Sequence, residues 1–202
     1  MAVSRLSRQS VQTGFPKQQT IWDQSTQYAA MDALASVTVT NPSGVSTITF
    51  SSIPQTYTHL QLRCNEVFTS GGYSTQLRFN SDTGSNYSFH ALYTAGTTPS
   101  ATAGATQTLI YINGWWQGHS TVYPYSSITD ILDYTNTNKY KVTRTLGGFD
   151  VNGTNSEISI SSGLWYKAGS GVTSDAVTTI TLTINSSQNF AINSSYTLYG
   201  IK

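Results

Sequence analysis

Residues 47–63 contain two short runs in which apolar and polar residues alternate, one on each side of Pro54. Ile48 and Phe50 alternate with threonines before the proline, and the alternation resumes after it and continues through Leu62. A period of two residues is typical of a β-strand that buries one face. Because proline cannot donate a hydrogen bond to a strand ladder, Pro54 is expected between two strands or at the start of one. This stretch therefore predicts a β-fold.

Similar alternating runs follow along the rest of the chain, and residues that favour tight turns separate them. Such turns include residues 80–84 and Asn152-Gly153, which is a strong hairpin signal. Short strands at regular spacing, without an internal repeat, predict a single antiparallel β-sandwich or jelly roll. The expected strands are residues 37–40, 45–50, 60–67, 73–79, 87–93, 106–113, 119–125, 127–134, 139–145, 157–161, 164–167, 177–184 and 195–201.

Several short segments are expected to interrupt or end these strands. Residues 94–104 are small and include no core-forming side chain, which predicts a loop. Gly147-Gly148 and Ser162-Gly163 are expected to break the strands around them. The final strand, at residues 195–201, must pair with another strand, and the strands around Pro54 are its expected neighbours.

Residues 1–36 differ from the rest of the chain and are expected to form an extended N-terminal docking arm, followed by a sandwich domain at 37–202. Their larger apolar residues recur without a sustained period. Such a segment cannot bury enough surface by itself to offset the entropy lost on ordering. A plain tail is the alternative, but tails seldom contain Phe, Trp and Tyr, so we expect the arm to order on a sister subunit or a larger scaffold. A short helical turn is expected over 23–31, and the expected anchors of the arm are Leu6, Phe15, Trp22 and Tyr28.

The balance of charges excludes several classes of partner. Charged residues make up only 9% of the chain and the net charge is +1, whereas a typical soluble domain has about 25% charged residues. The chain therefore has no overall field that would recruit nucleic acid or an anionic membrane. No run of about 18 apolar residues occurs, and no apolar segment of a signal peptide follows Arg5 and Arg8. We expect a protein that is made in the cytosol and has no membrane partner.

Cys64 is the only cysteine, which excludes an internal disulfide bond. It lies in phase with Leu60 and Leu62, so a buried side chain is expected rather than a nucleophile. Without disulfides, stability must come from the core or from contacts between subunits.

Three segments of the chain together resemble a family of virion proteins. They are Phe50-Ser-Ser-Ile-Pro-Gln-Thr-Tyr-Thr-His-Leu-Gln-Leu-Arg63, Leu77-Arg-Phe-Asn-Ser-Asp-Thr-Gly-Ser-Asn-Tyr-Ser88 and Tyr196-Thr-Leu-Tyr-Gly-Ile-Lys202. These segments are similar to a β-sandwich domain of tail-fibre and other virion-surface proteins of tailed phages, particularly phages of cyanobacteria. The resemblance covers residues 45–202 and implies a structural role without enzymatic activity. It implies no particular functional residue, and it leaves head and tail locations open.

No arrangement of acidic residues points to catalysis. A glycosidase needs two carboxylates that flank a sugar, and Asp130 and Asp133 are an example of such a pair. Their odd spacing would place them on opposite faces of one strand. We therefore expect no enzymatic activity. Of the three functions that we consider for this chain, a polysaccharide hydrolase is the least favoured.

The histidines and one acidic turn give no strong metal signal. His59, His90 and His119 are isolated in sequence, so none of them forms a zinc-binding pair on one strand; a site shared by three strands stays open. Residues 80–86 resemble an oxygen-rich calcium loop but lack the terminal bidentate glutamate. A turn held by Asx hydrogen bonds is the favoured interpretation, and we expect no metal or other cofactor.

Three clusters of aromatic residues are candidates for a contact surface. Neighbouring residues of a strand point to opposite faces, so one Trp of Trp115-Trp116 can be exposed while the other is in the core. Exposed rings beside Asn, Gln and Ser suit stacking on sugars or a subunit interface, and large core residues at a sheet rim are an equal alternative. The candidates are Trp115, Trp116, Tyr123, Tyr125, Trp165 and Tyr166.

Together these features predict a non-enzymatic structural protein of a phage virion, anchored by its arm to other virion proteins. A homotrimer is the expected assembly, from the missing disulfides, the low charge and the habits of such phage domains. A tail-fibre or tail-tip protein that contacts host polysaccharide is the first expectation, and a capsid decoration protein on the head is the alternative. Exposed Trp-rich loops would favour the fibre, whereas a broad flat apolar base would favour the decoration protein.

Overall fold

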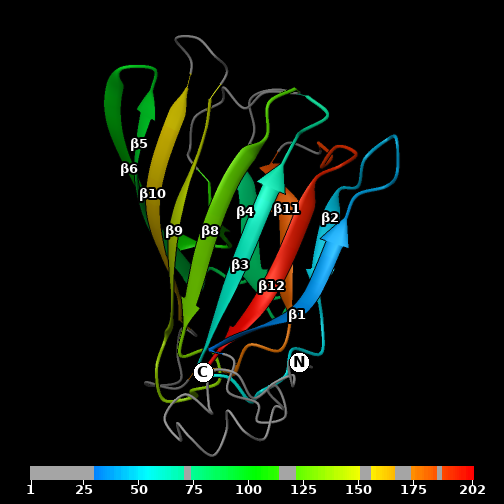
Figure 1. Cartoon of the computed structure of the whole chain (residues 1–202). Helices are drawn as coiled ribbons and strands as arrows, with labels where there is room; N and C mark the ends of the chain where they lie inside the picture. The colour runs from blue at the N-terminus through cyan, green and yellow to red at the C-terminus, as the bar shows by residue number, and fades with distance from the viewer. Residues whose placement is uncertain (1–29, 71–73, 114–121, 151–155, 167–173, 186–187) are drawn as a thin grey trace, which may run out of the picture. The chain divides into compact units, whose positions relative to one another are not determined.

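A computed structural model of the chain describes residues 30–70, 74–113, 122–150, 156–166, 174–185 and 188–202. Its strands form two antiparallel sheets that pack together, so the predicted β-sandwich is confirmed (Figure 1). The strands are β1 (Met31–Thr38), β2 (Thr47–Phe50), β3 (His59–Glu66), β4 (Thr75–Phe79), β5 (Tyr87–Ala95), β6 (Thr98–Gln107), β7 (Ile110–Tyr111), β8 (Tyr125–Leu132), β9 (Lys141–Phe149), β10 (Glu157–Trp165), β11 (Ile180–Ile184) and β12 (Ser195–Ile201).

The larger sheet has eight strands in the order β1-β12-β3-β8-β9-β10-β5-β6, and the smaller sheet has four in the order β2-β11-β4-β7. In Figure 1 the larger sheet faces the viewer, and β4 and β11 lie behind it. Apolar residues from the facing sides of the two sheets form one hydrophobic core. Leu60 and Leu62 from the larger sheet and Leu77 and Leu182 from the smaller sheet are among its fully buried members.

Eight of the strands form a jelly roll. When β5, β6, β9 and β10 are set aside, the remaining strands have the orders β1-β12-β3-β8 and β2-β11-β4-β7. Along the chain these strands alternate between the two sheets, except that β4 and β7 belong to the same sheet. Eight antiparallel strands wound in this way are the jelly-roll arrangement.

Two inserted hairpins widen the larger sheet beyond the jelly roll. The hairpin of β5 and β6 is inserted between β4 and β7, and the hairpin of β9 and β10 is inserted between β8 and β11. Since β10 pairs with β5 and β9 pairs with β8, the two hairpins continue the sheet without a gap. We call β1, β12, β3 and β8 the jelly-roll half of the larger sheet, and β9, β10, β5 and β6 its extension.

Glycines in the extension lie inside strands, which corrects the expectation that they break them. β9 runs through Gly147 and Gly148, and β10 runs through Gly163. A Cβ added at Gly147 would lie 2.6 Å from the hydroxyl of Tyr125, and one at Gly163 would lie 2.4 Å from the side chain of Ile110. Glycine is needed at these positions because neighbouring side chains pack against bare backbone.

Two segments between strands also differ from the expectation. Residues 98–104, predicted as part of a loop, belong to β6, which pairs with β5 at the edge of the sheet. Most residues of β6 are small and exposed, so an edge strand of this kind carries no alternating apolar signal. Residues 122–124, predicted as the end of a strand, precede β8 and have no strand structure.

The sandwich begins at Met31 rather than at Val37, because β1 pairs with β12 along its whole length. A β-bulge between Ala33 and Ala35 shifts the register, and the strand is mostly half-exposed or exposed. Both features disturb the period-two pattern that would have identified the strand in the sequence.

The segment around Pro54 and the C-terminal strand follow the expectation. Pro54 lies between β2 and β3, which belong to different sheets, so this segment carries the chain from one layer of the sandwich to the other. The backbone N–H of Ile53 donates to the carbonyl oxygen of Thr178 at 3.1 Å. β12 pairs with β3, with Ile201 opposite His59, as predicted.

Candidate interaction face

The outer side of the larger sheet carries a row of exposed aliphatic residues. Ile128 of β8, Leu146 of β9, Ile160 of β10 and Leu92 of β5 lie opposite one another in the strand register. They are 44%, 54%, 58% and 62% exposed, respectively. Ile158, the preceding outward residue of β10, is 56% exposed. We call these five residues the outer aliphatic face.

The extension builds this face by a reversed alternation. Every second residue of β9 and β10 points inward and is buried. In β10 the inward residues include Ser159 and Ser161, and in β9 they include Thr143 and Thr145. The middle of β9 and β10 is therefore polar inside and aliphatic outside, although Phe89 of β5 and Trp165 at the end of β10 still join the core. An antiparallel sheet with one solvated face ordinarily places its apolar residues inward.

Several of the buried hydroxyl groups hydrogen-bond to one another across strands. Thr129 Oγ1 of β8 and Thr145 Oγ1 of β9 lie 2.9 Å apart. Tyr125 OH of β8 and Ser159 Oγ of β10 also form a hydrogen bond. These bonds offset much of the cost of removing the hydroxyls from water, which explains how the extension tolerates a polar inner side.

Two shallow hollows lie on the outer side of the sheet. One, of about 590 Å³, spans β9, β10, β5 and β6 and includes Leu92, Arg144 and Ile160 in its lining. The other, of about 670 Å³, spans β3, β8, β9 and β10 and includes Ile128 and Leu146. Since members of the outer aliphatic face line both hollows, the face offers relief into which apolar side chains of a partner can insert.

Polar residues of both charges border the outer aliphatic face. Asp130 of β8 lies opposite Arg144 of β9 and accepts a hydrogen bond from Gln61 Nε2 at 2.8 Å. Gln61 Oε1 in turn accepts from Arg63 Nε at 2.9 Å, and the Arg63 guanidinium lies 4.8 Å from the ring centre of Tyr199. This network gives the outer side of β3 and β12 an ordinary polar surface.

The structure places two of the aromatic contact candidates in the interior. Trp165 is 2% exposed and Tyr125 is 1% exposed, so the prediction that they contact a glycan or another subunit is wrong. Both are inward residues of their strands. The ring of Trp165 packs 5.5 Å from that of Phe79 and 6.3 Å from that of Tyr87, centre to centre.

The remaining contact candidates differ in what the structure shows of them. Tyr123 is 40% exposed. Tyr166 is partly exposed, and its ring meets that of Tyr140 edge-on at 6.1 Å. These two residues are accessible to a partner. Trp115 and Trp116 lie outside the described residues, as do the arm anchors Leu6, Phe15, Trp22 and Tyr28. Of the helical turn expected at 23–31 only Ala30 and Met31 are described, and Met31 is not helical but begins β1.

The turn at residues 80–86 is held by the carboxylate of Asp82. Asp82 Oδ1 accepts a hydrogen bond from the backbone N–H of Gly84 at 2.8 Å. Asp82 Oδ2 accepts from Asn86 Nδ2 at 2.9 Å and from Trp165 Nε1 at 2.8 Å. The predicted Asx turn is therefore confirmed, and its carboxylate also ties the β4–β5 connection to the end of β10.

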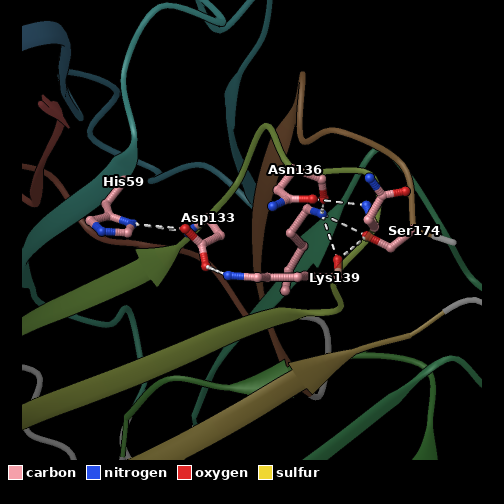
Figure 2. Close-up of polar contacts among 7 residues, drawn as sticks. His59, Asp133, Asn136, Lys139 and Ser174 are labelled. Atoms are coloured by element: carbon pink, nitrogen blue, oxygen red, sulfur yellow. Dashed lines mark hydrogen bonds and ion pairs between the residues drawn. The ribbon is translucent and has the colours of Figure 1, made fainter. Parts of the chain in front are cut away.

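A cluster of charged and polar residues gathers beside the turn between β8 and β9 (Figure 2). His59 Nδ1 accepts a hydrogen bond from the backbone N–H of Asp133 at 2.9 Å. Lys139 Nζ donates to Asp133 Oδ2 at 3.0 Å, and this bond lowers the pKa of the Asp133 carboxyl. Asp133 thus stabilises the turn, whereas Asp130 lies on the outer side of β8 and is bonded to Gln61.

Lys141 and Ser174 form a buried contact in the same cluster (Figure 2). The ammonium of Lys141 donates to the carbonyl oxygens of Asn136 and Lys139 and, at 2.6 Å, to Ser174 Oγ. The Ser174 hydroxyl donates to the carbonyl oxygen of Lys139 at 2.7 Å. Burial lowers the pKa of Lys141, and as an ammonium it can donate all three N–H groups to these partners. These hydrogen bonds attach the turn between β8 and β9 to Ser174.

Glu66 is buried on the inner side of the jelly-roll half. Its Oε2 accepts hydrogen bonds from Thr75 Oγ1 at 2.7 Å and from Asn113 Nδ2 at 3.3 Å. Burial raises the pKa of Glu66 to about 7, although these two bonds lower it. Cys64 is buried nearby, and burial raises the pKa of its thiol. The prediction of a buried cysteine is confirmed.

Glu157 is buried at the start of β10, on the inner side of the extension. Burial raises its pKa to about 8. Neither oxygen of its carboxyl group has a hydrogen-bond partner among the residues that the structure describes. The sequence offers no signal for this burial, because a glutamate at a strand end ordinarily points to solvent.

Within the described ranges, no group of three His, Cys, Asp or Glu side chains is arranged to hold a metal ion. None of the described segments forms a helix long and apolar enough to cross a membrane. Comparison of the chain with protein-family models, with curated proteins and with solved structures gives no match. The resemblance to virion proteins therefore stays a prediction from the sequence.

Proposed function

We propose that this protein is a non-enzymatic structural subunit of a tailed-phage virion and that it assembles through the outer aliphatic face. The observation that carries the proposal is the row of Ile128, Leu146, Ile160 and Leu92, which crosses four strands in register on the outer side of the larger sheet. Contiguous exposed apolar surface of this kind marks sites of association in soluble proteins.

Two further features support the virion role. Jelly rolls are a common architecture of viral coat proteins and of lectin domains, but a fold by itself does not select a function. The virion-like segments at residues 50–63 and 196–202 contribute β3 and β12, which pair with each other. The third virion-like segment, at residues 77–88, contributes the end of β4 and the start of β5, so the resemblance extends over both sheets, and β5 also carries Leu92 of the assembly face.

The described surface favours a decoration protein on the head over a tail-fibre protein. Of the aromatic residues on which the fibre role depended, Trp165 and Tyr125 are buried, and Trp115 and Trp116 lie outside the described residues. A decoration protein needs a broad apolar surface against its neighbours, which the outer aliphatic face supplies. Contact of Tyr123 and Tyr166 with host polysaccharide remains the basis of the fibre alternative.

Mass spectrometry of separated phage heads and tails tests the location. The decoration role predicts that the chain is found in the head fraction only. Detection in tails only would support the fibre alternative, and absence from both fractions would refute the virion proposal.

Deletion of residues 1–30 tests the docking arm separately. We propose that the arm binds other virion proteins, so the truncated chain should fold, with the far-ultraviolet circular dichroism of a β-protein, but should not join the virion. Normal incorporation of the truncated chain would refute the anchoring role. Glycan hydrolysis that disappears in Asp130→Asn or Asp133→Asn would refute the non-enzymatic role.

A further inference from the structure

We propose that the outer aliphatic face docks against the same face of a second copy of this chain. The inference rests on the proposed role of this face in assembly and adds the identity of the partner. The contact would pair the β8, β9, β10 and β5 strands of the two copies face to face, in the manner of two sheets packed in a sandwich.

The chemistry of the face is self-complementary. The structure describes eight exposed large hydrophobic residues, and five of them are Leu92, Ile128, Leu146, Ile158 and Ile160. The best match for an aliphatic sheet surface is a second aliphatic sheet surface, and the described part of the chain presents such a surface only here. In a contact with two-fold symmetry the same patch is used by both subunits.

The size of the surface fits a weak, reversible pair. Neighbouring strands lie about 4.8 Å apart and successive residues about 3.4 Å apart, so the outer side of β8, β9, β10 and β5 offers a footprint on the order of 20 by 20 Å. The hollows add relief to this footprint. The footprint is smaller than the roughly 800 Å² per partner that stable interfaces bury, so we expect a pair that dissociates on dilution.

The charges around the face also permit self-docking. Asp130 and Arg144 lie side by side in the polar row next to the aliphatic one. A two-fold arrangement can bring Asp130 of one copy toward Arg144 of the other, so the approach of two identical surfaces does not oppose like charges. A face with charges of one sign only would have excluded a second copy.

Sedimentation velocity of the full chain over a range of concentrations tests the inference. We expect a reversible dimer, and we expect Leu146→Asp/Ile160→Asp to weaken dimerisation by about 100-fold or more. Both residues are exposed in the single chain, so the variant should keep the circular dichroism of the wild type. The matched control is Ile192→Asp, an exposed isoleucine outside the face, which should leave dimerisation unchanged.

Cysteine cross-linking gives a second readout that does not depend on a loss of affinity. Because Cys64 is buried, a cysteine introduced by Ile160→Cys or Leu146→Cys is the accessible thiol among the described residues. We expect one of these variants to form a disulfide-linked dimer on mild oxidation. The rate of cross-linking should fall on dilution only when the protein concentration drops below the dissociation constant of the dimer. Thr197→Cys, on the polar outer side of β12, is the control and should not cross-link.

Three outcomes would overturn the inference. The first is a wild-type chain that stays monomeric at high concentration. The second is an oligomer that is unaffected by Leu146→Asp/Ile160→Asp. The third is the trimer expected from the sequence, because a face that pairs with itself joins copies in twos. If the wild type is monomeric but Leu146→Asp/Ile160→Asp fails to enter virions, docking to a second copy is refuted. The proposed role of the face in assembly with other virion proteins then stands.

Discussion

Two strands of the larger sheet, β3 in the jelly-roll half and β10 in the extension, turn opposite kinds of side chain toward the interior. In the jelly-roll half, β3 turns Leu60 and Leu62 inward and Gln61 and Arg63 outward. In the extension, β10 turns Ser159 inward and its isoleucines outward. Both halves belong to one continuous hydrogen-bonded sheet.

The difference shows that the inward side of a strand is selected by what packs against it. The smaller sheet covers the inner side of the jelly-roll half and supplies aliphatic partners such as Leu77 and Leu182. In the extension, Gly163 lies under Ile110, and the Thr145 hydroxyl of β9 pairs with that of Thr129 on the neighbouring β8. Small and hydroxylated residues fit the inner side of the middle of β9 and β10, so the aliphatic residues there are left outside, where an assembly can bury them.

Truncation of one aliphatic residue in each half should give the largest contrast. Leu62→Ala should lower the free energy of unfolding by about 2–5 kcal/mol, because it opens a cavity in the core. Ile160→Ala should change it by no more than about 0.5 kcal/mol in the dissociated chain, because the residue is already half in water. Urea unfolding of dilute protein measures both values, and equal losses would contradict the reversed alternation.

The buried glutamates should make stability fall as the pH rises. The pKa of Glu157 is about 8 in the folded protein and about 4.3 in an unfolded chain. Between these values the folded state holds a proton that the unfolded chain has released, so rising pH favours unfolding, by a total on the order of a few kcal/mol. Glu66, with a pKa of about 7, acts in the same direction over a narrower range.

Thermal melting of Glu157→Gln and Glu66→Gln between pH 5 and 9 separates the contributions of the two glutamates to the pH dependence of stability. Glu157→Gln should flatten the pH dependence and be more stable than the wild type at pH 9. Glu66→Gln should keep its stability at pH 5, because the amide oxygen can accept the same hydrogen bonds from Thr75 and Asn113, and should flatten the pH dependence over a narrower range. A wild-type melting temperature that does not change from pH 5 to pH 9 would argue against buried carboxyls in either half.

Adding one methyl group to the inner side of the extension should have an intermediate effect. Gly163→Ala would place a Cβ 2.4 Å from Ile110 and should cost about 1–3 kcal/mol through overpacking. Ser162→Ala is the matched control, since Ser162 is the neighbouring residue on the exposed side of β10. If both variants unfold at the same urea concentration as the wild type, the close packing of Ile110 on β10 is not present in solution.

Charge reversal on the outer side should have the smallest effect. Arg144→Glu places a second acidic residue opposite Asp130, and like charges opposite each other in a sheet cost less than about 1 kcal/mol. The loss should shrink in 1 M salt, where the Debye length falls to about 3 Å. Arg144→Ala serves as the control, and a loss that is independent of salt would point to packing rather than charge.

Much of the fold could be predicted because it depends on local patterns. The alternation around Pro54 located β2 and β3, and the turn at residues 80–86 was identified from its Asx and glycine residues. The strands that were missed or cut short are those with small residues. β6 has few apolar residues, and β9 and β10 contain glycines that normally end strands but here admit neighbouring side chains.

The candidate site could not be predicted from the sequence, for a different reason. The sequence drew attention to aromatic residues, of which Trp165 and Tyr125 proved to be core residues. The residues of the outer aliphatic face have the same pattern as core residues of an ordinary strand. Nothing in Ile158-Ser159-Ile160-Ser161 states which of its two faces is covered, because both assignments satisfy a period of two.

The sequence by itself therefore determined that the chain forms short antiparallel strands, since alternation and turn residues act within a few positions of one another. Only the tertiary structure decided which side of each strand faces the core. That choice depends on the volume left between the sheets, and the volume depends on residues far away in the chain, such as Ile110 over Gly163. The outer aliphatic face is the consequence. Its apolar residues are exposed in the folded chain because the small residues next to them in each strand are the ones that fit between the sheets.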